Sequence, residues 1–380
     1  MFEWFRRRHE TERRLSVYPT PQGLALAMSD RDERGGLVIR WAEHIAFETP
    51  AFEPGFTLEI EEPAPAPVEQ RGGQERRGGD RRATDRRQGD RRKGDRRLDK
   101  VLPAPTRADA SPPNPKAVEL LQRIVRERDL RNVPCTGLLR SGDYSLVLLD
   151  ALALPASEIR GAVRWQLREL IDFPAEEAVI DVFDVPEPDG GTARRMYAVA
   201  ARRERVQQLV NLLNYADLDI KAIDIPELAL RNIAALLPED EGGVALISLD
   251  RQQGLMTVTR QHALYFARRV DCGTERLLSA AGGQEFTPAL EFLLDKLIVE
   301  VQRSLDFYER NFNQSPVTGI VFTPVPGVSR RVCDYMQSQL GVPVRWLDIA
   351  ATCDVEVPDS LLLDGLSVLG SGLRDDTVTL

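Results

Sequence analysis

The chain has 380 residues, of which 42% are hydrophobic and 29% charged, so it is long enough for two or three domains with substantial cores. Its net charge is −9, and no apolar run reaches the roughly 20 residues that a membrane-spanning helix needs. Four widely spaced cysteines, three histidines and a start without a signal-peptide pattern argue against a disulfide framework, a zinc site or a secreted protein, and we expect a cytoplasmic one.

The first 61 residues are predicted to form the N-terminal part of a first lobe. Segments 15–28 and 36–48 are apolar, flank a polar turn at Ser29–Asp32, and are typical of strands in a hairpin or meander. Met1–Arg8 places aromatic side chains beside three arginines. This segment is either a frayed terminus or a weak contact with an anionic membrane, since one short anchor binds only marginally.

Residues 62–115 are predicted to form a disordered linker. Between Arg71 and Lys100 there are thirteen Lys or Arg and six Asp or Glu, a local charge of +7 that leaves −16 for the rest of the chain. From Glu75 the sequence repeats every five residues as ERRGG, DRRAT, DRRQG, DRRKG, DRRLD, a period of neither helix nor strand. The arginine pairs could hold phosphate on nucleic acid, anionic lipid or a cyclic dinucleotide. The acid beside each pair favours a self-solvating linker, and we expect no nucleic-acid partner.

After the linker, helices and strands alternate. Up to residue 237 we expect helices at 117–126, 157–171, 204–216 and 226–237, and strands at 135–139, 145–149, 178–185, 195–201 and 220–225. The strands at 135–139 and 145–149 are expected to pair around the turn at Ser141–Asp143. A three-stranded meander follows (244–249, 255–259 and 262–269), then a long helix at 287–311 and a strand, a helix and a strand ending near Trp346. The pattern predicts two related α/β halves, with 116–240 completing the first lobe around an inserted subdomain and 241–380 forming the second.

Three motifs follow one another in the second part of the chain. They are Leu154–Trp165 with Asp172–Val179 (LPASEIRGAVRW and DFPAEEAV), Asp219–Asp224 with Ala229–Arg231, and Glu300–Tyr308 (EVQRSLDFY). In this order they resemble the PilM family of type IV pilus proteins. The endings Gly341–Val344 and Asp364–Leu366 also fit. The resemblance runs from about residue 115 to the C-terminus, and the MSHA-pilus members (MshI) are the nearest type.

This resemblance implies an α/β, actin/Hsp70-like duplicated fold, with two lobes around a nucleotide cleft and a small inserted subdomain. It also implies a protein peripheral to the inner membrane that binds the cytoplasmic tail of a PilN-like membrane protein. Such a protein connects that partner to the pilus assembly ATPase complex.

The nucleotide elements of this superfamily are altered here. The first hairpin of the family carries a D-I-G triplet, where this chain has Ser16–Pro21 with two prolines that lack amide donors. In the second hairpin, Ser248 replaces an acid and Asp250 a glycine, and the adenosine loop keeps only Gly327. We expect no catalytic residue, no metal site and no cofactor. Weak binding of ATP and magnesium, favoured by the retained Gly273, is the alternative; Asp181 and Asp224 are interpreted as turn or capping acids.

The helix expected from Ser157 carries a candidate partner surface. Its apolar stripe consists of Ile159, Ala162, Val163, Leu167, Leu170 and Ile171. Trp165 lies roughly 150° from this stripe, beside Arg168. With Arg164 and Phe173 it either lines a partner groove or packs on a neighbouring subdomain. The acidic body would attract a basic membrane-partner tail.

These observations favour a non-catalytic scaffold of type IV, MSHA-like pilus biogenesis. The alternative is an ATP-dependent actin-like switch of the same machinery. A secretion-system domain of the same superfamily and a nucleic-acid binder are less favoured.

Overall fold

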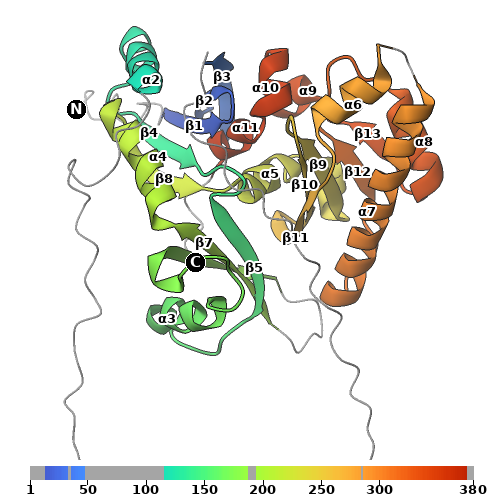
Figure 1. The fold of residues 1–380 in the computed structure, drawn as a ribbon, viewed down its shortest axis with the longest axis horizontal. Coiled ribbons are helices and arrows are strands. Elements are labelled where there is room, and N and C mark those ends of the chain that lie inside the picture. The colour runs from blue at the N-terminus through green and yellow to red at the C-terminus, as the bar shows by residue number, and fades with distance from the viewer. Residues whose placement is uncertain (1–12, 33–35, 48–114, 187–193, 284–285, 375–380) are drawn as a thin grey trace, which may run out of the picture. The chain divides into compact units, whose positions relative to one another are not determined.

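Two five-stranded sheets with the same strand order form the framework of the protein (Figure 1). The computed structural model describes residues 13–32, 36–47, 115–186, 194–283 and 286–374. These residues belong to one unit, assembled from 1–56 and 110–380. The predicted linker at 62–115 and the segment Met1–Arg8 lie outside the described residues, except for Pro115, the first residue of helix α2.

The first sheet combines an antiparallel meander with two parallel strands. Its strands, in spatial order, are β3 (Leu37–Ala46), β2 (Gly23–Arg31), β1 (Arg14–Thr20), β4 (Pro134–Leu138) and β8 (Asp219–Asp224). In the register, Val17 of β1 lies opposite Leu26 on one side and Gly137 on the other. Segment 15–28, expected as one continuous strand region, is divided by a turn at Pro21–Gln22.

The second sheet repeats this arrangement. It contains β11 (Ala263–Val270), β10 (Gly254–Arg260), β9 (Val244–Leu249), β12 (Gly319–Phe322) and β13 (Val344–Trp346). Here too a three-stranded antiparallel meander is continued by two parallel strands. The repeated topology confirms the predicted duplicated two-lobe fold of the actin-like class.

A third sheet, with a helix on it, forms the inserted subdomain. Antiparallel strands β5 (Tyr144–Asp150), β7 (Arg195–Arg202) and β6 (Ala178–Val185) carry α3 (Ala156–Leu167) and the short 3-10 helix η2 (Ala175–Glu177). Figure 1 shows α3 beside β5 and β7. The expected hairpin of 135–139 with 145–149 is wrong, because β4 joins the first sheet and β5 pairs with β7 in the third.

The ends of α3 also differ from the prediction. Pro155, not Ser157, occupies the N-cap position, and no side chain caps the helix. The helix ends at Leu167 and is followed by turns, so Leu170, which was placed on the buried stripe, is exposed. Val163 and Leu167 do pack in the subdomain core with Leu149 and Met196.

The remaining helices cover the two large sheets. They are α2 (Pro115–Glu127), α4 (Arg203–Tyr215), α5 (Pro226–Ala234), the 3-10 helix η3 (Pro238–Glu241), α6 (Thr274–Ala281), α7 (Pro288–Phe312), α8 (Arg331–Leu340), α9 (Ile349–Cys353), α10 (Asp359–Asp364) and α11 (Ser367–Gly372). Helix α7 matches its prediction closely. The hydroxyl of Thr287 caps it by accepting from the Leu290 amide at 3.0 Å, and Pro288 occupies the first helical position.

Helix α11 returns the C-terminal part of the chain to the first sheet, where it packs on α5, β1 and β2. The close approach depends on Gly370, since a Cβ there would lie 1.9 Å from the carbonyl oxygen of Ala229. The side-chain amide of Asn232 (Nδ2) also donates to the Gly370 carbonyl at 2.8 Å. The last described residues therefore belong to the first lobe, although the segment before them forms the second.

Candidate functional site

A chain of polar contacts joins the turn of the β1–β2 hairpin to the turn of the β9–β10 hairpin. The hydroxyl of Thr20 lies 3.1 Å from Nε2 of His44, which in turn lies 3.9 Å from Oδ2 of Asp364. Nε of Arg251, in the β9–β10 turn, lies 3.5 Å from the same Asp364 oxygen. We call these four residues the cleft cluster, because they lie between the β1–β2 and β9–β10 hairpins, where the sequence analysis expects the nucleotide cleft.

The cleft cluster is largely shielded from solvent. The side chains of His44 and Asp364 are 2% and 1% exposed, whereas that of Arg251 is 28% exposed. Burial raises the pKa of Asp364 to about 6, against the opposing charge of Arg251. Burial lowers the pKa of His44, and Arg251 adds to this effect. The arrangement favours a neutral imidazole beside a carboxylate that one guanidinium holds in its charged form.

Asp250 and Tyr18 lie next to this cluster. Burial, and then the charge of Asp364, raises the pKa of Asp250 to about 7. Burial and the nearby Asp250 carboxyl raise the pKa of Tyr18 well above its usual value. The structure therefore brings three groups with raised pKa values, Asp364, Asp250 and Tyr18, into one poorly solvated region. Arg251 opposes the rise in the pKa of Asp364, and Arg140 opposes that of Tyr18.

The amides at the start of α6 are bonded to the β9–β10 turn. The N–H of Thr274 donates to the carbonyl of Asp250 at 2.8 Å, and that of Glu275 donates to the carbonyl of Arg251 at 3.0 Å. Such amides are the groups that a helix start would otherwise offer to a phosphate. The Asp250 N–H is also occupied, because it donates to the carbonyl of Gln253 at 2.9 Å.

Gly273 has a packing reason to be glycine. A Cβ at this position would lie 2.3 Å from the carbonyl oxygen of Arg251 and equally close to the carbonyl carbon of Gln252. The backbone of the turn thus crosses directly over Gly273. This close backbone contact is sufficient to explain the glycine at position 273 without a bound ligand.

The other predicted nucleotide positions are distributed over separate elements. Ser16 is buried in the middle of β1, opposite Ala27 and Thr136. Ser248 is buried on β9, where the adjacent Leu249 amide donates to the hydroxyl of Thr323 at 3.2 Å. Gly327 has a φ of +86° in the loop after β12, a conformation that favours glycine. Ser248, Asp250 and Gly273 thus gather around the β9–β10 hairpin.

The predicted partner residues separate into exposed and structural groups. Trp165 is 69% exposed, and the guanidinium of Arg168 lies 3.9 Å from its ring centroid. Arg168 also donates to Glu176 at 2.6 Å, which holds it over the indole. Arg164 instead donates to the backbone carbonyls of Ala175 and Ala178.

Phe173 does not share the surface of Trp165. It is buried in the subdomain core, and the guanidinium of Arg202 covers its ring at 4.3 Å. The expectation that it lines a groove with Trp165 is therefore wrong, because its ring fills the space under α3. We define the α3 surface as the exposed pair of Trp165 and Arg168.

A shallow recess of about 520 Å³ lies on the same subdomain. Its lining combines leucines with two acids and one arginine: Leu148, Leu149, Asp150, Gln166, Glu169, Leu170 and Arg195. The acidic side chains and the exposed Leu170 give this recess the character expected for a basic, partly apolar peptide.

The two acids considered as catalytic candidates have structural partners. Asp181 is exposed on β6 and pairs with Arg160 at 2.9 Å. Asp224 is buried at the end of β8, where it accepts from the Ile225 amide at 2.9 Å and pairs with Arg374 at 3.0 Å. Ile225 is the N-cap residue of α5, so Asp224 stabilises the turn that leads into this helix.

The sequence analysis missed Tyr18, His44, Arg251 and Asp364. Their separation along the chain conceals their proximity, since Asp364 reaches the β9–β10 turn only because α10 and α11 pack on the first lobe. Among the described residues, no set of three or more His, Cys, Asp or Glu side chains is arranged to hold a metal ion. In the same residues no helix is both long and apolar enough to cross a membrane.

Residues 116–281 match the family model described as "Type IV pilus assembly protein PilM". Two of the three predicted motifs lie within this range, and Glu300–Tyr308 lies beyond it. No curated protein matches the sequence.

One solved structure supports the fold, and a second one is less similar. The chain is similar to a structure described as "PilM-PilN type IV pilus biogenesis complex", with 15% identity, a TM-score of 0.61, and coverage of 95% of this chain and 98% of that one. It is also similar to the cytoplasmic domain of EpsL of the Vibrio cholerae type II secretion system, with 10% identity, a TM-score of 0.40, and coverage of 95% and 94%. The first likeness agrees with the duplicated topology described above.

Proposed function

We propose, from the premise that the chain is PilM-like over residues 116–281, that it is a non-catalytic cytoplasmic scaffold of type IV pilus assembly. The match to the family model is the observation that carries this proposal. In this role the protein lies at the inner face of the membrane and joins a membrane partner to the assembly ATPase complex. The altered nucleotide elements favour the MSHA-like branch of these systems.

The cleft supports a role without nucleotide hydrolysis. Pro19 and Pro21 remove amide donors from the first hairpin, and the first amides of α6 are bonded to the second. Asp250 stands where a phosphate would require glycine, and the ion pair of Arg251 with Asp364 joins the same region. These residues do not fit a magnesium–nucleotide complex, because they leave phosphate with few donors and add negative charge beside it.

The partner we propose is the cytoplasmic tail of a PilN-like membrane protein. A structure of the same fold is described as a complex of PilM with PilN. On this chain, the α3 surface offers an exposed tryptophan with a stacked arginine, residue types that dominate binding energy at interfaces. The acidic recess beside it suits the basic residues that such tails carry on the cytoplasmic side.

Two measurements test this function. Calorimetric titration of the full chain with magnesium–ATP should give no saturable heat up to millimolar nucleotide. A fluorescent peptide of the PilN-like tail should bind the full chain, with affinity reduced about tenfold or more in Trp165→Ala. Phe292→Ala is the matched control, since Phe292 is a similarly exposed aromatic residue on α7.

The outcomes separate the scaffold from the switch. Micromolar binding of magnesium–ATP would overturn the non-catalytic assignment and support the actin-like switch. Tail binding that is weakened equally by Trp165→Ala and Phe292→Ala would show that α3 is not the docking surface.

A further inference from the structure

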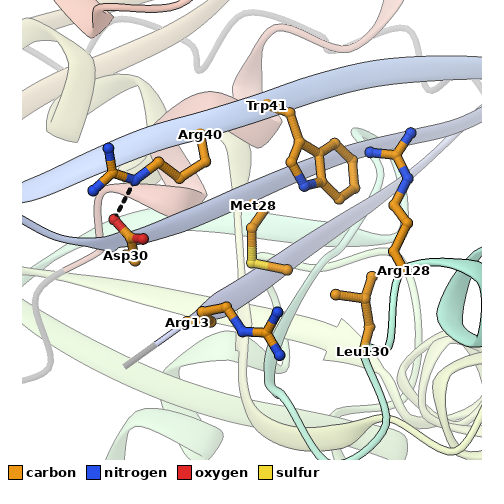
Figure 2. A pocket seen from close by; sticks show the side chains of 7 residues that line it. All are labelled: Arg13, Met28, Asp30, Arg40, Trp41, Arg128 and Leu130. Atoms are coloured by element: carbon orange, nitrogen blue, oxygen red, sulfur yellow. Dashed lines mark hydrogen bonds and ion pairs between the residues drawn. The ribbon is translucent and has the colours of Figure 1, made fainter. Parts of the chain in front are cut away.

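A second recess lies at the opposite end of β1 from the cleft cluster (Figure 2). It has a volume of about 490 Å³ and is lined by residues from the start of β1, from β2 and β3, and from the loop between α2 and β4: Arg13, Met28, Asp30, Arg40, Trp41, Arg128 and Leu130. Strand β1 runs from Arg14 to Thr20, so about 20 Å of strand separates this recess from the cleft cluster. We call it the β1-start recess.

The lining of the β1-start recess is more basic than acidic. Nε of Arg40 pairs with Oδ1 of Asp30 at 2.5 Å, and Nη2 of Arg128 pairs with Oε2 of Glu43 at 2.7 Å. Nη2 of Arg13 donates instead to the neutral carbonyl of Asp129 at 3.2 Å. Among the described residues that line the recess there are three guanidiniums and one carboxylate, that of Asp30. Arg40 is paired with Asp30, and Arg128 with Glu43 outside the lining, so Arg13 is left as the positive charge of the lining without a carboxylate partner there.

The rest of the wall is apolar and aromatic. Met28 and Leu130 are buried, and the guanidinium of Arg128 lies 3.9 Å from the ring centroid of Trp41. Figure 2 shows the side chains of Arg13, Trp41 and Arg128 around Met28 and Leu130. Apolar and aromatic side chains beside convergent charged groups are typical of small-molecule sites.

We propose that the β1-start recess binds a phosphodiester of net negative charge, without a cationic group of its own, whose substituent is apolar or planar. A phosphodiester carries one negative charge, which matches the excess positive charge of the lining. Arginine forks recognise phosphate oxygens through paired N–H donors. The Arg13 guanidinium lines the recess, and within the part of the chain that the structure describes it donates only to a neutral acceptor, the carbonyl of Asp129. The substituent then lies against Met28, Leu130 and the Trp41–Arg128 stack. A phospholipid headgroup and a cyclic nucleotide both have this chemistry.

The test is calorimetric titration of the full chain with soluble, monomeric probes. Dihexanoyl-phosphatidylglycerol represents the lipid source and cyclic AMP the nucleotide source, with the zwitterionic dihexanoyl-phosphatidylcholine as control. Monomeric probes are needed because residues 71–100 carry a charge of +7 and would attract any anionic vesicle. Saturable binding of either anionic probe, tighter than the control, supports the proposal and identifies the source. Binding of neither probe overturns it.

Substitutions of opposite expected sign locate the site. Arg13→Gln should weaken binding about tenfold, because it removes one charge-assisted contact. Arg123→Gln is the matched control, since this exposed arginine on α2 lies outside the recess and pairs only loosely with Glu127 at 4.0 Å. Asp30→Asn should tighten binding, because it removes a carboxylate and releases Arg40. Tighter binding by Asp30→Asn would support the assignment without ambiguity, because misfolding cannot tighten binding. An Asp30→Asn variant that binds no better than the wild type contradicts the assignment. So does an Arg13→Gln variant that binds as well as the wild type.

Discussion

The carboxylate of Asp364 lies 3.5 Å from Nε of Arg251, and this ion pair links the two lobes of the protein. Asp364 ends α10, which packs on β3 of the first sheet, whereas Arg251 forms the turn between β9 and β10 of the second. The side chains of the two lobes thus make a direct contact at this place. The ion pair therefore contributes to the free energy of unfolding only while the two lobes keep this relative position.

Arg251→Met should destabilise the protein, because it leaves the Asp364 carboxylate buried without its cation. A fully buried pair would cost about 3–5 kcal/mol, but Arg251 is partly exposed and Asp364 can take up a proton, so we expect about 2 kcal/mol. Urea denaturation of Arg251→Met, Asp364→Asn and the double variant measures the coupling. The exposed pair of Arg276 with Asp271 supplies the control, since Arg276→Met should cost little. Equal losses from both methionine substitutions would show that the cleft pair has no special importance.

Stability should fall as the pH rises toward 8, because of Asp250. Its pKa is about 7 in the folded protein and about 3.8 when unfolded, so between these values the folded state holds more protons than the unfolded state. The free energy of unfolding therefore decreases with increasing pH in this window, as the pH rises through the folded pKa, and becomes constant above about 8. Asp364, with a pKa of about 6, acts in the same direction, whereas the lowered pKa of His44 acts in the opposite one.

Asp250→Asn isolates this contribution. The hydrogen bonds of Asp250 in the hairpin use its backbone N–H and carbonyl, so the amide should preserve them. We expect the stability difference between variant and wild type to grow in favour of the variant by about 1 kcal/mol between pH 5.5 and 8. Melting temperatures measured across this range provide the check. A difference that does not change with pH would show that Asp250 titrates normally.

The duplicated fold was predictable because its signals are local. The strands of the second meander and helix α7 carry regular apolar patterns with clear turns and caps, and the structure places them as expected. The partner of β4 was not predictable from its turn. A short apolar run such as Cys135–Leu138 suits a buried parallel strand as well as a hairpin, and only the tertiary fold decides between them.

Other features follow from contacts distant in sequence. Helix α11 has the sequence SVLGSG, which propensity would assign to a loop. Gly370 permits the close approach to α5 that stabilises this helix, so the cause of the helix lies in its contact with Ala229 rather than in its own residues. The cleft cluster is hidden for the same reason. By contrast, the exposure of Trp165 was predictable from its angle on α3, since that angle depends only on local spacing.

Two glycine-to-alanine substitutions should have opposite effects on stability. At Gly273 the new Cβ would meet the backbone of Arg251 and Gln252 at 2.3 Å, so the β9–β10 turn must move, and we expect a loss of about 2–3 kcal/mol.

At Gly161, in the middle of α3, the structure places no atom within 4 Å of the added Cβ, and alanine should stabilise the helix by about 0.5–1 kcal/mol. Chemical denaturation of both variants measures these changes. If Gly273→Ala left the free energy of unfolding unchanged, the β9–β10 turn would not be in close contact with this residue. The packing explanation for its glycine would then fail, and a ligand-binding role for Gly273 would regain support.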